Sequence, residues 1–312
     1  MKQLLFKKIQ SYNDPALGEF VTHALDTLIK ETSLENKKVL IKPNLLAPSR
    51  PDQAVCTHPE VVYQVARYFV ENGAVVQISD SPAVGNFEKI VQSTGLKKHL
   101  APLGVEIKPF RKSILADIGA PFGKIEIAED ALTSDLLVNL PKLKTHSQML
   151  LTLAVKNLFG CIVGMRKPEW HLRAGIDRER FAELLYLIAK KLSPQINLLD
   201  GILGMHGDGP GKSGTPVRTA IVVASPDPLL VDIAVCKYLG VSPHSLPTVK
   251  AAMVSERGLT VEDVEFVERF EREFNLPNLG PVVFGPAFLH GFMRRHLTER
   301  PVLSGRCMLC KE

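Results

Sequence analysis

The sequence predicts an α/β protein with a mainly parallel open sheet covered by helices on both faces. First, short apolar runs typical of strands alternate along the chain with amphipathic helical patterns. Second, 45% hydrophobic and 23% charged residues are ordinary values for a globular protein. Third, 312 residues exceed what one small core needs. We therefore expect an α/β core over 1–285, with room for two lobes (1–140 and 141–285).

Helix and strand patterns alternate through the first half of the chain. Residues 15–31 place seven apolar side chains on one helical face. The next helix opens at His58-Pro59 and stops at Asn72-Gly73. The predicted elements in chain order are helix 15–31, strand 38–42, helix 58–72, strand 74–79, helix 87–96, strand 105–109 and strand 124–127.

The second half continues the alternation around one long apolar stretch. Residues 149–165 form this stretch, which is shorter than the roughly 20 residues of a membrane helix. Lys156-Asn157 also interrupts it, so we interpret it as a buried helix. The predicted elements are strand 136–140, helix 148–163, helix 181–192, strand 196–199, strand 219–224 and helix 229–239. After Gly285 the pattern changes to a basic helix and tail over 286–312.

Composition and charge exclude several classes of function. The formal charge is +5, and the 38 basic residues form no long run and no aromatic-interleaved patch, which argues against a nucleic-acid partner. The mild positive charge favours an anionic small-molecule ligand. The first residues lack the apolar run of a signal peptide, and three isolated cysteines suit reduced thiols. We therefore expect a cytoplasmic protein without a membrane partner.

Polar residues gather where the predicted strands end. Loop amides and helix N-termini converge there in open α/β sheets, so ligands bind at that edge. A single such residue is usually a helix cap or a turn residue, but five strand ends together predict a site. The residues concerned are Lys42, Asn44, Asp80, Ser81, Lys142, Lys144, Thr145, His146, Asp200, Ser225 and Asp227.

Charge and titration chemistry suggest roles for these residues. The lysines would hold carboxylate or phosphate groups as point charges. Asp80, Asp200 and His146 are candidates for proton transfer or for metal binding. His58 could act in the same way, but its place before Pro59 fits a helix cap equally well. We expect Lys42, Asp80, Lys144, His146 and Asp200 to surround one pocket.

Lys156 stands out because nearly all its neighbours in sequence are apolar. A lysine is almost never fully buried without a partner, and burial lowers the pKa of its ammonium group. We expect a buried catalytic Lys156 that contacts a carboxylate or a ligand. The alternative is that its stem crosses an apolar surface and its charge reaches water.

The loop from Gly204 to Gly214 resembles two phosphate-binding patterns, and each fails on one point. A Walker A motif would need glycine where His206 stands. Gly209, Gly211 and Gly214 spell the dinucleotide fingerprint, but a predicted strand follows instead of a helix. The loop, including Gly207, could still bind an anion through its backbone amides, or it could be a plain mobile loop.

Several long motifs, which occur in order over roughly residues 37–255, resemble the family called domain of unknown function 362. They are Val39-Leu-Ile-Lys-Pro-Asn-Leu45, Thr57-His-Pro-Glu60, Ser79-Asp-Ser-Pro82, Asp135-Leu-Leu-Val-Asn-Leu-Pro-Lys-Leu-Lys-Thr-His146, Leu151-Thr-Leu-Ala-Val-Lys-Asn-Leu-Phe-Gly160, Asp200-Gly-Ile-Leu-Gly-Met205, Gly207-Asp-Gly-Pro210 and Ala224-Ser-Pro-Asp-Pro228. The resemblance adds Thr57 and Asn157 to the candidate ligand-binding residues. Many members of the family look like fusions to a ferredoxin-type module with two four-iron clusters, which implies redox work.

The last two cysteines form a C-x-x-C pair, Cys307 and Cys310. Such a pair is open to three interpretations: a zinc half-site, a redox pair or two unrelated thiols. Ferredoxin-type modules begin with this spacing, and the resembling family continues into its clusters at this place. We expect the two cysteines to be the first 4Fe-4S ligands of a module that continues in a longer protein, and the cluster not to be intact in these 312 residues.

Three functions are compatible with these features. The first is an enzyme or enzyme component that acts on an anionic small molecule, linked to iron–sulfur electron transfer and a redox partner protein. The second is a non-catalytic ligand-binding or cofactor maturation factor. The third is a metal-dependent lyase, isomerase or hydrolase.

Overall fold

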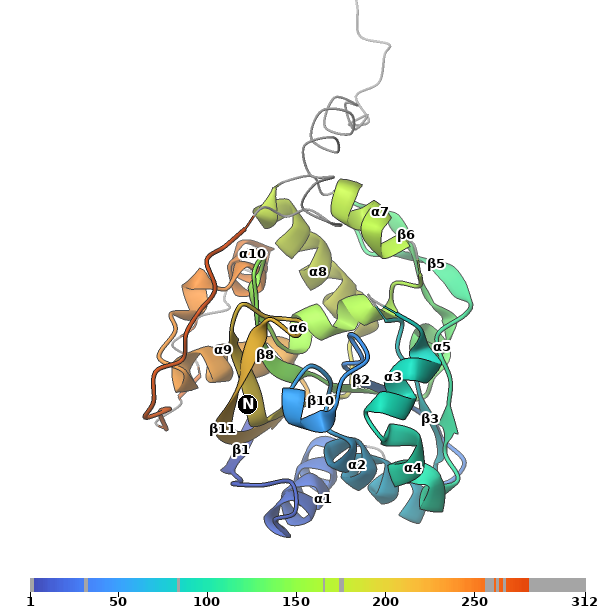
Figure 1. Cartoon of the computed structure of the whole chain (residues 1–312). Coiled ribbons are helices and arrows are strands. Elements are labelled where there is room, and N and C mark those ends of the chain that lie inside the picture. The colour runs from blue at the N-terminus through green and yellow to red at the C-terminus, as the bar shows by residue number, and fades with distance from the viewer. Residues whose placement is uncertain are drawn as a thin grey trace, which may run out of the picture.

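A nine-stranded, mostly parallel sheet forms the centre of the protein, as the sequence predicts (Figure 1). The computed structural model describes residues 3–30, 33–82, 85–164, 166–173, 177–255, 261, 264–265 and 268–280. The strand order is β1-β11-β10-β7-β2-β3-β4, and β8 extends the sheet from β10 to β9. The strands of the sheet are β1 Leu5–Lys8, β2 Lys38–Pro43, β3 Val75–Ile78, β4 Glu106–Ile107, β7 Leu136–Leu140, β8 Lys142–His146, β9 Leu150–Thr152, β10 Ile196–Gly207 and β11 Gly214–Ser225.

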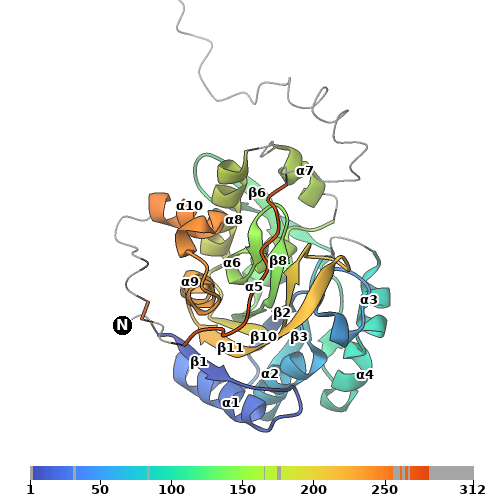
Figure 2. The same cartoon turned by 60° about the vertical axis from the view of Figure 1, so that its left-hand side comes forward.

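Helices cover both faces of this sheet and enclose a separate apolar core on each face (Figures 1 and 2). The helices on one face are α1 Ala16–Leu28, α2 Pro59–Glu71, α3 Phe87–Ser93 and α4 Leu96–Leu100. Those on the other side are α5 Glu129–Thr133, α6 Ala154–Asn157, α7 Arg166–Arg173, α8 Arg178–Leu192, α9 Pro228–Tyr238 and α10 Pro247–Ser255. Short 3-10 turns are η1 Pro51–Gln53, η2 Ala101–Leu103, η3 Leu158–Cys161 and η4 Pro243–Ser245.

Local sequence explains where several helices begin and break. His58 caps α2, because its side chain accepts a hydrogen bond from the backbone N–H of Glu60. Pro59 occupies the first helical position, where a missing N–H does no harm. The predicted helix 87–96 is two helices, because Gly95 has a positive φ of 72° between α3 and α4.

The predicted buried helix over 148–163 is wrong in its first part. Residues Leu150–Thr152 form strand β9, which pairs antiparallel with β8, and only Ala154–Asn157 is α-helical before the turn η3. Length and apolarity do not distinguish a buried helix from a buried strand followed by a turn. The chain turns back between β8 and β9, and Leu150 has a φ of +66° there. The hydrophobic periodicity of the sequence does not indicate this turn.

Two further features were not predicted. Strands β5 Ser113–Asp117 and β6 Lys124–Ala128 form a separate antiparallel pair, so the strand expected at 124–127 is not part of the main sheet. The main sheet joins strands from both sides of residue 140, because β7 lies between β2 and β10.

The division into two lobes stays a prediction, and the tail 286–312 lies outside the described residues. Within the described ranges, no helix is long and apolar enough to cross a membrane.

Candidate functional site

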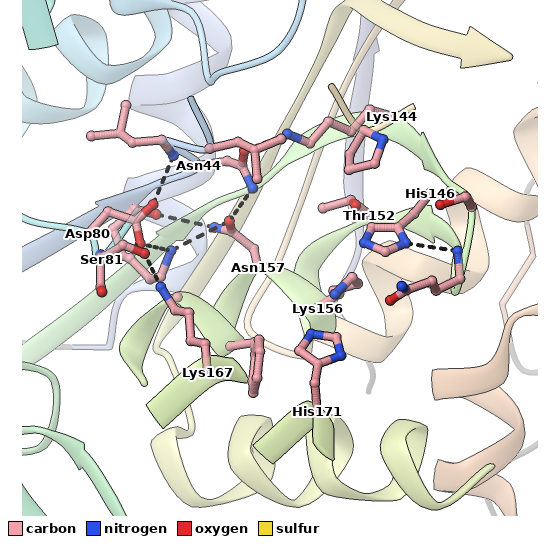
Figure 3. A pocket seen from close by; sticks show the side chains of 18 residues that line it. Asn44, Asp80, Ser81, Lys144, His146, Thr152, Lys156, Asn157, Lys167 and His171 are labelled. Carbon is pink, nitrogen blue, oxygen red and sulfur yellow. Dashed lines mark hydrogen bonds and ion pairs between the residues drawn. The ribbon is translucent and has the colours of Figure 1, made fainter. Parts of the chain in front are cut away.

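A polar cavity of about 240 Å³ lies at the carboxyl ends of β2, β3 and β8, where the sequence predicts a site (Figure 3). Its walls come from these strand ends and from the segment β9–α6–α7. Lining residues are Lys42, Asn44, Leu45, Leu46, Asp80, Ser81, Lys144, His146, Ser147, Gln148, Thr152, Lys156, Asn157, Phe159, Gly160, Lys167, His171 and Pro210.

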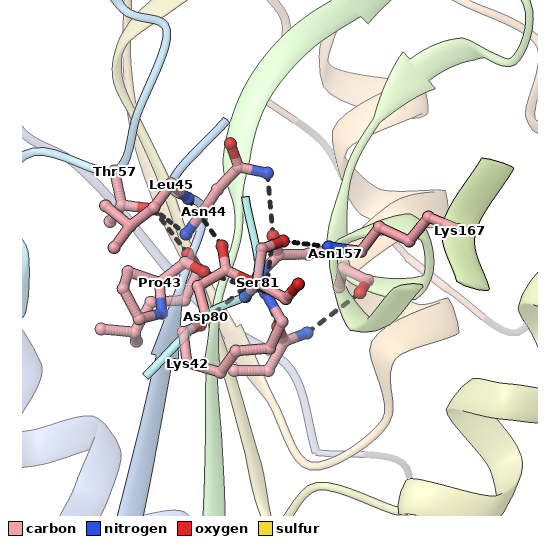
Figure 4. A network of polar contacts seen from close by, with 12 residues as sticks. Lys42, Pro43, Asn44, Leu45, Thr57, Asp80, Ser81, Asn157 and Lys167 are labelled. Atoms are coloured by element: carbon pink, nitrogen blue, oxygen red, sulfur yellow. Dashed lines mark hydrogen bonds and ion pairs between the residues drawn. The ribbon is translucent and has the colours of Figure 1, made fainter. Parts of the chain in front are cut away.

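At one end of the cavity, Lys42 and Asp80 form a buried ion pair (Figure 4). They extend from the neighbouring parallel strands β2 and β3, and 2.9 Å separates Lys42 Nζ from Asp80 Oδ1. The backbone amides of Leu45 and Ser81 both donate to the Asp80 carboxylate at 2.8 Å. The Asp80 side chain thus bridges Lys42 and two backbone amides, which hold it in one orientation.

A row of amide side chains crosses the sheet beneath this ion pair. In the register of β2, β7 and β10, Lys42 lies opposite Asn139, and Asn139 lies opposite Asn197. Asn157 donates to Asn139 at 2.7 Å and accepts from Asn44 at 2.9 Å. Each amide thereby fixes the orientation of the next, and the row holds this wall of the cavity in one arrangement.

Lys144 and Lys167 bring two more charges to the wall, and both donate to backbone carbonyls. Lys144 Nζ lies 2.6 Å from Val55 O and 2.7 Å from Asn44 Oδ1. Burial lowers the pKa of Lys144 to about 7. Lys167, from α7, donates to the carbonyl of Ser81, and burial lowers its pKa to about 8.

Gly160 allows the backbone of η3 to lie against the Lys42–Asp80 pair. A Cβ atom placed on Gly160 would stand 2.5 Å from Lys42 Cε and closer still to Lys42 Nζ and Asp80 Oδ1. No larger residue fits without moving the buried ion pair. This close approach is the physical reason for glycine at position 160.

The opposite end of the cavity holds polar groups that have no ionic partner in the part of the chain that the structure describes. Lys156 forms no hydrogen bond or ion pair with any described residue, and its Nζ lies 5.7 and 5.4 Å from the ring centres of Phe159 and Phe181. The expected carboxylate contact is therefore not found. Burial lowers the Lys156 pKa to about 8. Thr152 Oγ1 is buried in the same wall without a hydrogen-bond partner among the described residues.

His146 completes this end as a neutral ring. Its Nδ1 accepts a hydrogen bond from the backbone N–H of Gln148 at 3.1 Å, which assigns its proton to Nε2. Burial lowers the His146 pKa well below 6.5, and the charge of Lys156 lowers it further. His146 therefore offers an N–H donor rather than a second positive charge.

Asp232 on α9 positions the helix that carries Lys156 and Asn157. Its carboxylate accepts from the backbone N–H groups of Ala154 at 2.7 Å and Val155 at 3.4 Å, the first turn of α6. The Asp232 side chain is buried, and burial raises its pKa well above the ordinary value. A buried acid from a distant element thus caps a helix that has no cap of its own.

Asp200 does not line the cavity, so the prediction that five residues surround one pocket is wrong for this residue. Lys142 lies opposite Asp200 across β8 and β10, and the two fully buried side chains form an ion pair at 2.8 Å. Tyr12 donates to Asp200 at 2.9 Å, and the Tyr12 ring stacks on His58 with 3.5 Å between ring centres. Lys142, Asp200 and His58 thus belong to a second cluster, where burial lowers the His58 pKa to about 4.

The remaining candidates have internal hydrogen-bonding roles. Thr57 Oγ1 accepts a hydrogen bond from the backbone N–H of Asn44 and donates to Leu140 O at 2.7 Å. Thr145 Oγ1 accepts from the backbone N–H of Gly209 at 3.2 Å. The amide of Gly207 donates to Asn275 O at 2.7 Å, so both glycine amides are engaged within the protein. Asp227 caps α9 by accepting from Leu229 at 2.8 Å and lies outside the cavity.

Ten of the residues that line the cavity were not among the predicted site residues, and four of these ten bear directly on its chemistry. His171 is buried on α7 beside the rings of Phe159 and Phe181. Lys167, Thr152 and Gly160 also line the cavity. The local sequence carries no signal for Gly160, because its role comes from close approach to Lys42 and Asp80 in distant segments. Cys307 and Cys310 lie outside the described residues, so their role stays a prediction. Within the described part of the chain, no group of three or more His, Cys, Asp or Glu side chains could hold a metal ion.

The fold and the cavity define an α/β protein with a lysine-rich cavity at the strand ends. The chain belongs to the family described as domain of unknown function (DUF362), which it matches over residues 39–237. It is 36% identical over 254 residues to the thylakoid-associated protein sll1697 of Synechocystis, covering 80% of this chain and 79% of that protein.

Two solved structures are similar over part of the chain. The lactate racemase apoprotein of Thermoanaerobacterium thermosaccharolyticum superimposes with a TM-score of 0.47 at 15% identity, covering 75% of this chain and 56% of the racemase. A Thermotoga maritima protein superimposes with a TM-score of 0.39 at 14% identity, covering 64% of this chain and 52% of that protein.

Proposed function

We propose that this protein is an enzyme, or an enzyme component, that binds an anionic small molecule in the cavity and moves a proton on it. The observation behind the proposal is the Lys156 ammonium, which lines the cavity without a carboxylate partner among the described residues. The described residues that line the cavity include four lysines and one carboxylate. An anionic ligand would supply the negative charge that this wall lacks.

Two side chains have protonation properties suited to acid–base work on such a ligand. A group exchanges protons most effectively when its pKa is close to the working pH. Lys156, with a pKa of about 8, meets this condition in cells near neutral pH. His146 Nε2–H would donate to an oxygen of the ligand as its negative charge develops.

The size of the cavity limits the ligand. A volume of about 240 Å³ is below the roughly 300–1,000 Å³ of sites for drug-sized ligands. We therefore propose an acid of a few carbon atoms or a small phosphate ester. The alternative is a maturation or delivery factor that binds the same kind of anion without turnover.

Binding of small anions to variants tests the proposal. Lys156→Met keeps the length and apolar stem of the side chain but removes the charge, and Lys191→Met removes an exposed charge from the end of α8. Calorimetric titration with glyoxylate, lactate, malonate and phosphate should show binding to the wild type and to Lys191→Met. A hydrogen bond to a charged group contributes about 1.5–3 kcal/mol, so Lys156→Met should bind about 10- to 100-fold more weakly. Equal affinity of both variants would refute the assignment of the cavity.

Turnover separates an enzyme from a binding factor. A proton-transfer enzyme should exchange the C–H hydrogen next to the carboxylate of a bound acid with deuterium from the solvent, which NMR detects. Binding without exchange or other turnover of the probe would favour a maturation role. The proposed link to iron–sulfur electron transfer rests on the pair Cys307 and Cys310 and on the family resemblance, and absorbance near 400 nm in a longer chain that includes the expected module would test it.

A further inference from the structure

We propose that Lys156 is an amine nucleophile that forms an imine with the carbonyl carbon of a small carboxylate-bearing aldehyde or ketone, such as a 2-oxo acid. The inference deepens the proposed function and depends on it, because the same cavity must first bind the anion.

The surroundings of Lys156 suit a neutral amine better than a purely ionic contact. The rings of Phe159 and Phe181 flank its Nζ, and no described carboxylate holds it as an ammonium. The nearby charge of Lys167 disfavours a second positive charge in the same cavity. Desolvation and a neighbouring cation are the two means by which proteins make a lysine nucleophilic.

The other groups at this end match the needs of a carbonyl substrate. His146 presents an Nε2–H, and a neutral N–H donor polarises a carbonyl oxygen without delivering a full charge. Thr152 Oγ1 is buried in the wall, has no partner among the described residues, and can accept or donate a hydrogen bond. Lys144 and Lys167 lie on the cavity wall and would balance the carboxylate of the ligand.

The proposed step is balanced in atoms and charge. The Nζ lone pair attacks the carbonyl carbon, a C–N bond forms, and the C=O π pair moves to the oxygen, which takes a proton. The nitrogen loses a proton to give a neutral carbinolamine. The hydroxyl then takes a second proton and leaves as water, while the nitrogen lone pair forms the C=N bond of an iminium ion. No oxidant or reductant is needed.

Reductive trapping tests this inference on the full chain. Glyoxylate is the probe, sodium borohydride quenches the equilibrated mixture, and peptide mass spectrometry locates the reduced adduct. One adduct at Lys156 is expected in the wild type and in Lys191→Met, and none at this cavity in Lys156→Met. Acetaldehyde, which lacks the carboxylate, should label Lys156 far less. Because the attack needs the free amine, the initial rate of adduct formation at Lys156, measured by quenching at early times, should rise about tenfold or more between pH 6 and pH 8, given its pKa of about 8.

Lys156→Arg separates this inference from anion binding itself. Arginine keeps the positive charge but does not lose its proton in proteins, so this variant should bind glyoxylate calorimetrically and give no adduct in the cavity. Thermal melting checks that each variant is folded. Wild-type binding without an adduct at Lys156, or adducts spread over exposed lysines, would overturn the imine and leave the proposed function standing. Absence of both binding and adduct would overturn both.

Discussion

Substitution of Gly160 by alanine should disturb the Lys42–Asp80 ion pair directly. The new Cβ would stand 2.5 Å from Lys42 Cε and closer to Lys42 Nζ and Asp80 Oδ1, distances that real Cβ atoms essentially never show. Neither side chain can move away freely. Lys42 is fully buried and donates to Pro43 O at 3.0 Å, and two backbone amides hold the Asp80 carboxylate. The clash must therefore separate two buried charges or shift η3.

The expected effect follows from the cost of breaking such a pair. Removing one partner of a buried ion pair costs about 3–5 kcal/mol, because the remaining charge is left uncompensated. In Gly160→Ala both charges stay and can partly re-pair, so we expect a loss of about 2–4 kcal/mol in the free energy of unfolding. The cavity wall should shift as well, so affinity for small anions should also fall.

Denaturant unfolding and calorimetric binding measure these two effects. Gly211→Ala is the matched control, because a Cβ on Gly211 would meet nothing within 4 Å. The control should stay within about 0.5 kcal/mol of the wild type, as surface substitutions usually do. If Gly160→Ala were as stable as the control and bound anions with wild-type affinity, the close approach would not matter and the reasoning would be refuted.

Three further predictions concern charge and pH. Affinity for small anions should be highest below pH 7 and fall as the pH rises from 7 to 8, because Lys144 and Lys156 lose their charge near pKa values of about 7 and 8. An affinity that calorimetry finds unchanged from pH 6 to 9 would contradict this prediction. Lys142→Met should lower the free energy of unfolding by about 3–5 kcal/mol in urea, because Asp200 is left buried without its partner. The double variant Lys142→Met with Asp200→Asn should recover part of this loss. A loss of under about 1 kcal/mol in the single variant would argue against the pair. The folded-state pKa of His58, about 4, lies below the unfolded value of about 6.5, so the unfolded chain binds more protons in this interval and stability should fall as pH drops from 6.5 to 4. His58→Asn keeps a capping side chain without titration, so its melting temperature should depend less steeply on pH; an unchanged slope would assign the effect to other groups.

Parallel strands explain why part of the site was predictable. Strands that run in one direction end at one edge of the sheet. Four site residues lie at or just after the ends of predicted strands, namely Lys42, Asn44, Asp80 and Lys144. The alternation of strand and helix patterns, together with an ordinary globular composition, predicted the α/β class. Lys156 was recognisable because a lysine in an apolar run needs a special environment.

Other features could not be recognised along the chain. Asp200 follows a predicted strand just as Asp80 does, but β10 continues past the sheet edge into a hairpin with β11. Its carboxylate consequently pairs with Lys142 outside the cavity. Lys167 and His171 lie in a segment whose local pattern suggests exposure, and only the packing of α7 brings them to the cavity.

The sequence by itself determined the elements and the kind of chemistry, because hydrophobic periodicity and residue type are local properties of the chain. Fold class, the edge that bears the site and the excess of lysine could be read from these. Only the tertiary structure decided which lysines are paired. Lys42 meets Asp80 across two strands, whereas Lys156 meets the ring of Phe159 from the following turn and the ring of Phe181 from α8. Asp80 and Phe181 both come from distant segments. Whether a lysine is a structural cation or a reactive amine depends on that partner, because the neighbouring charge and the loss of water set its pKa.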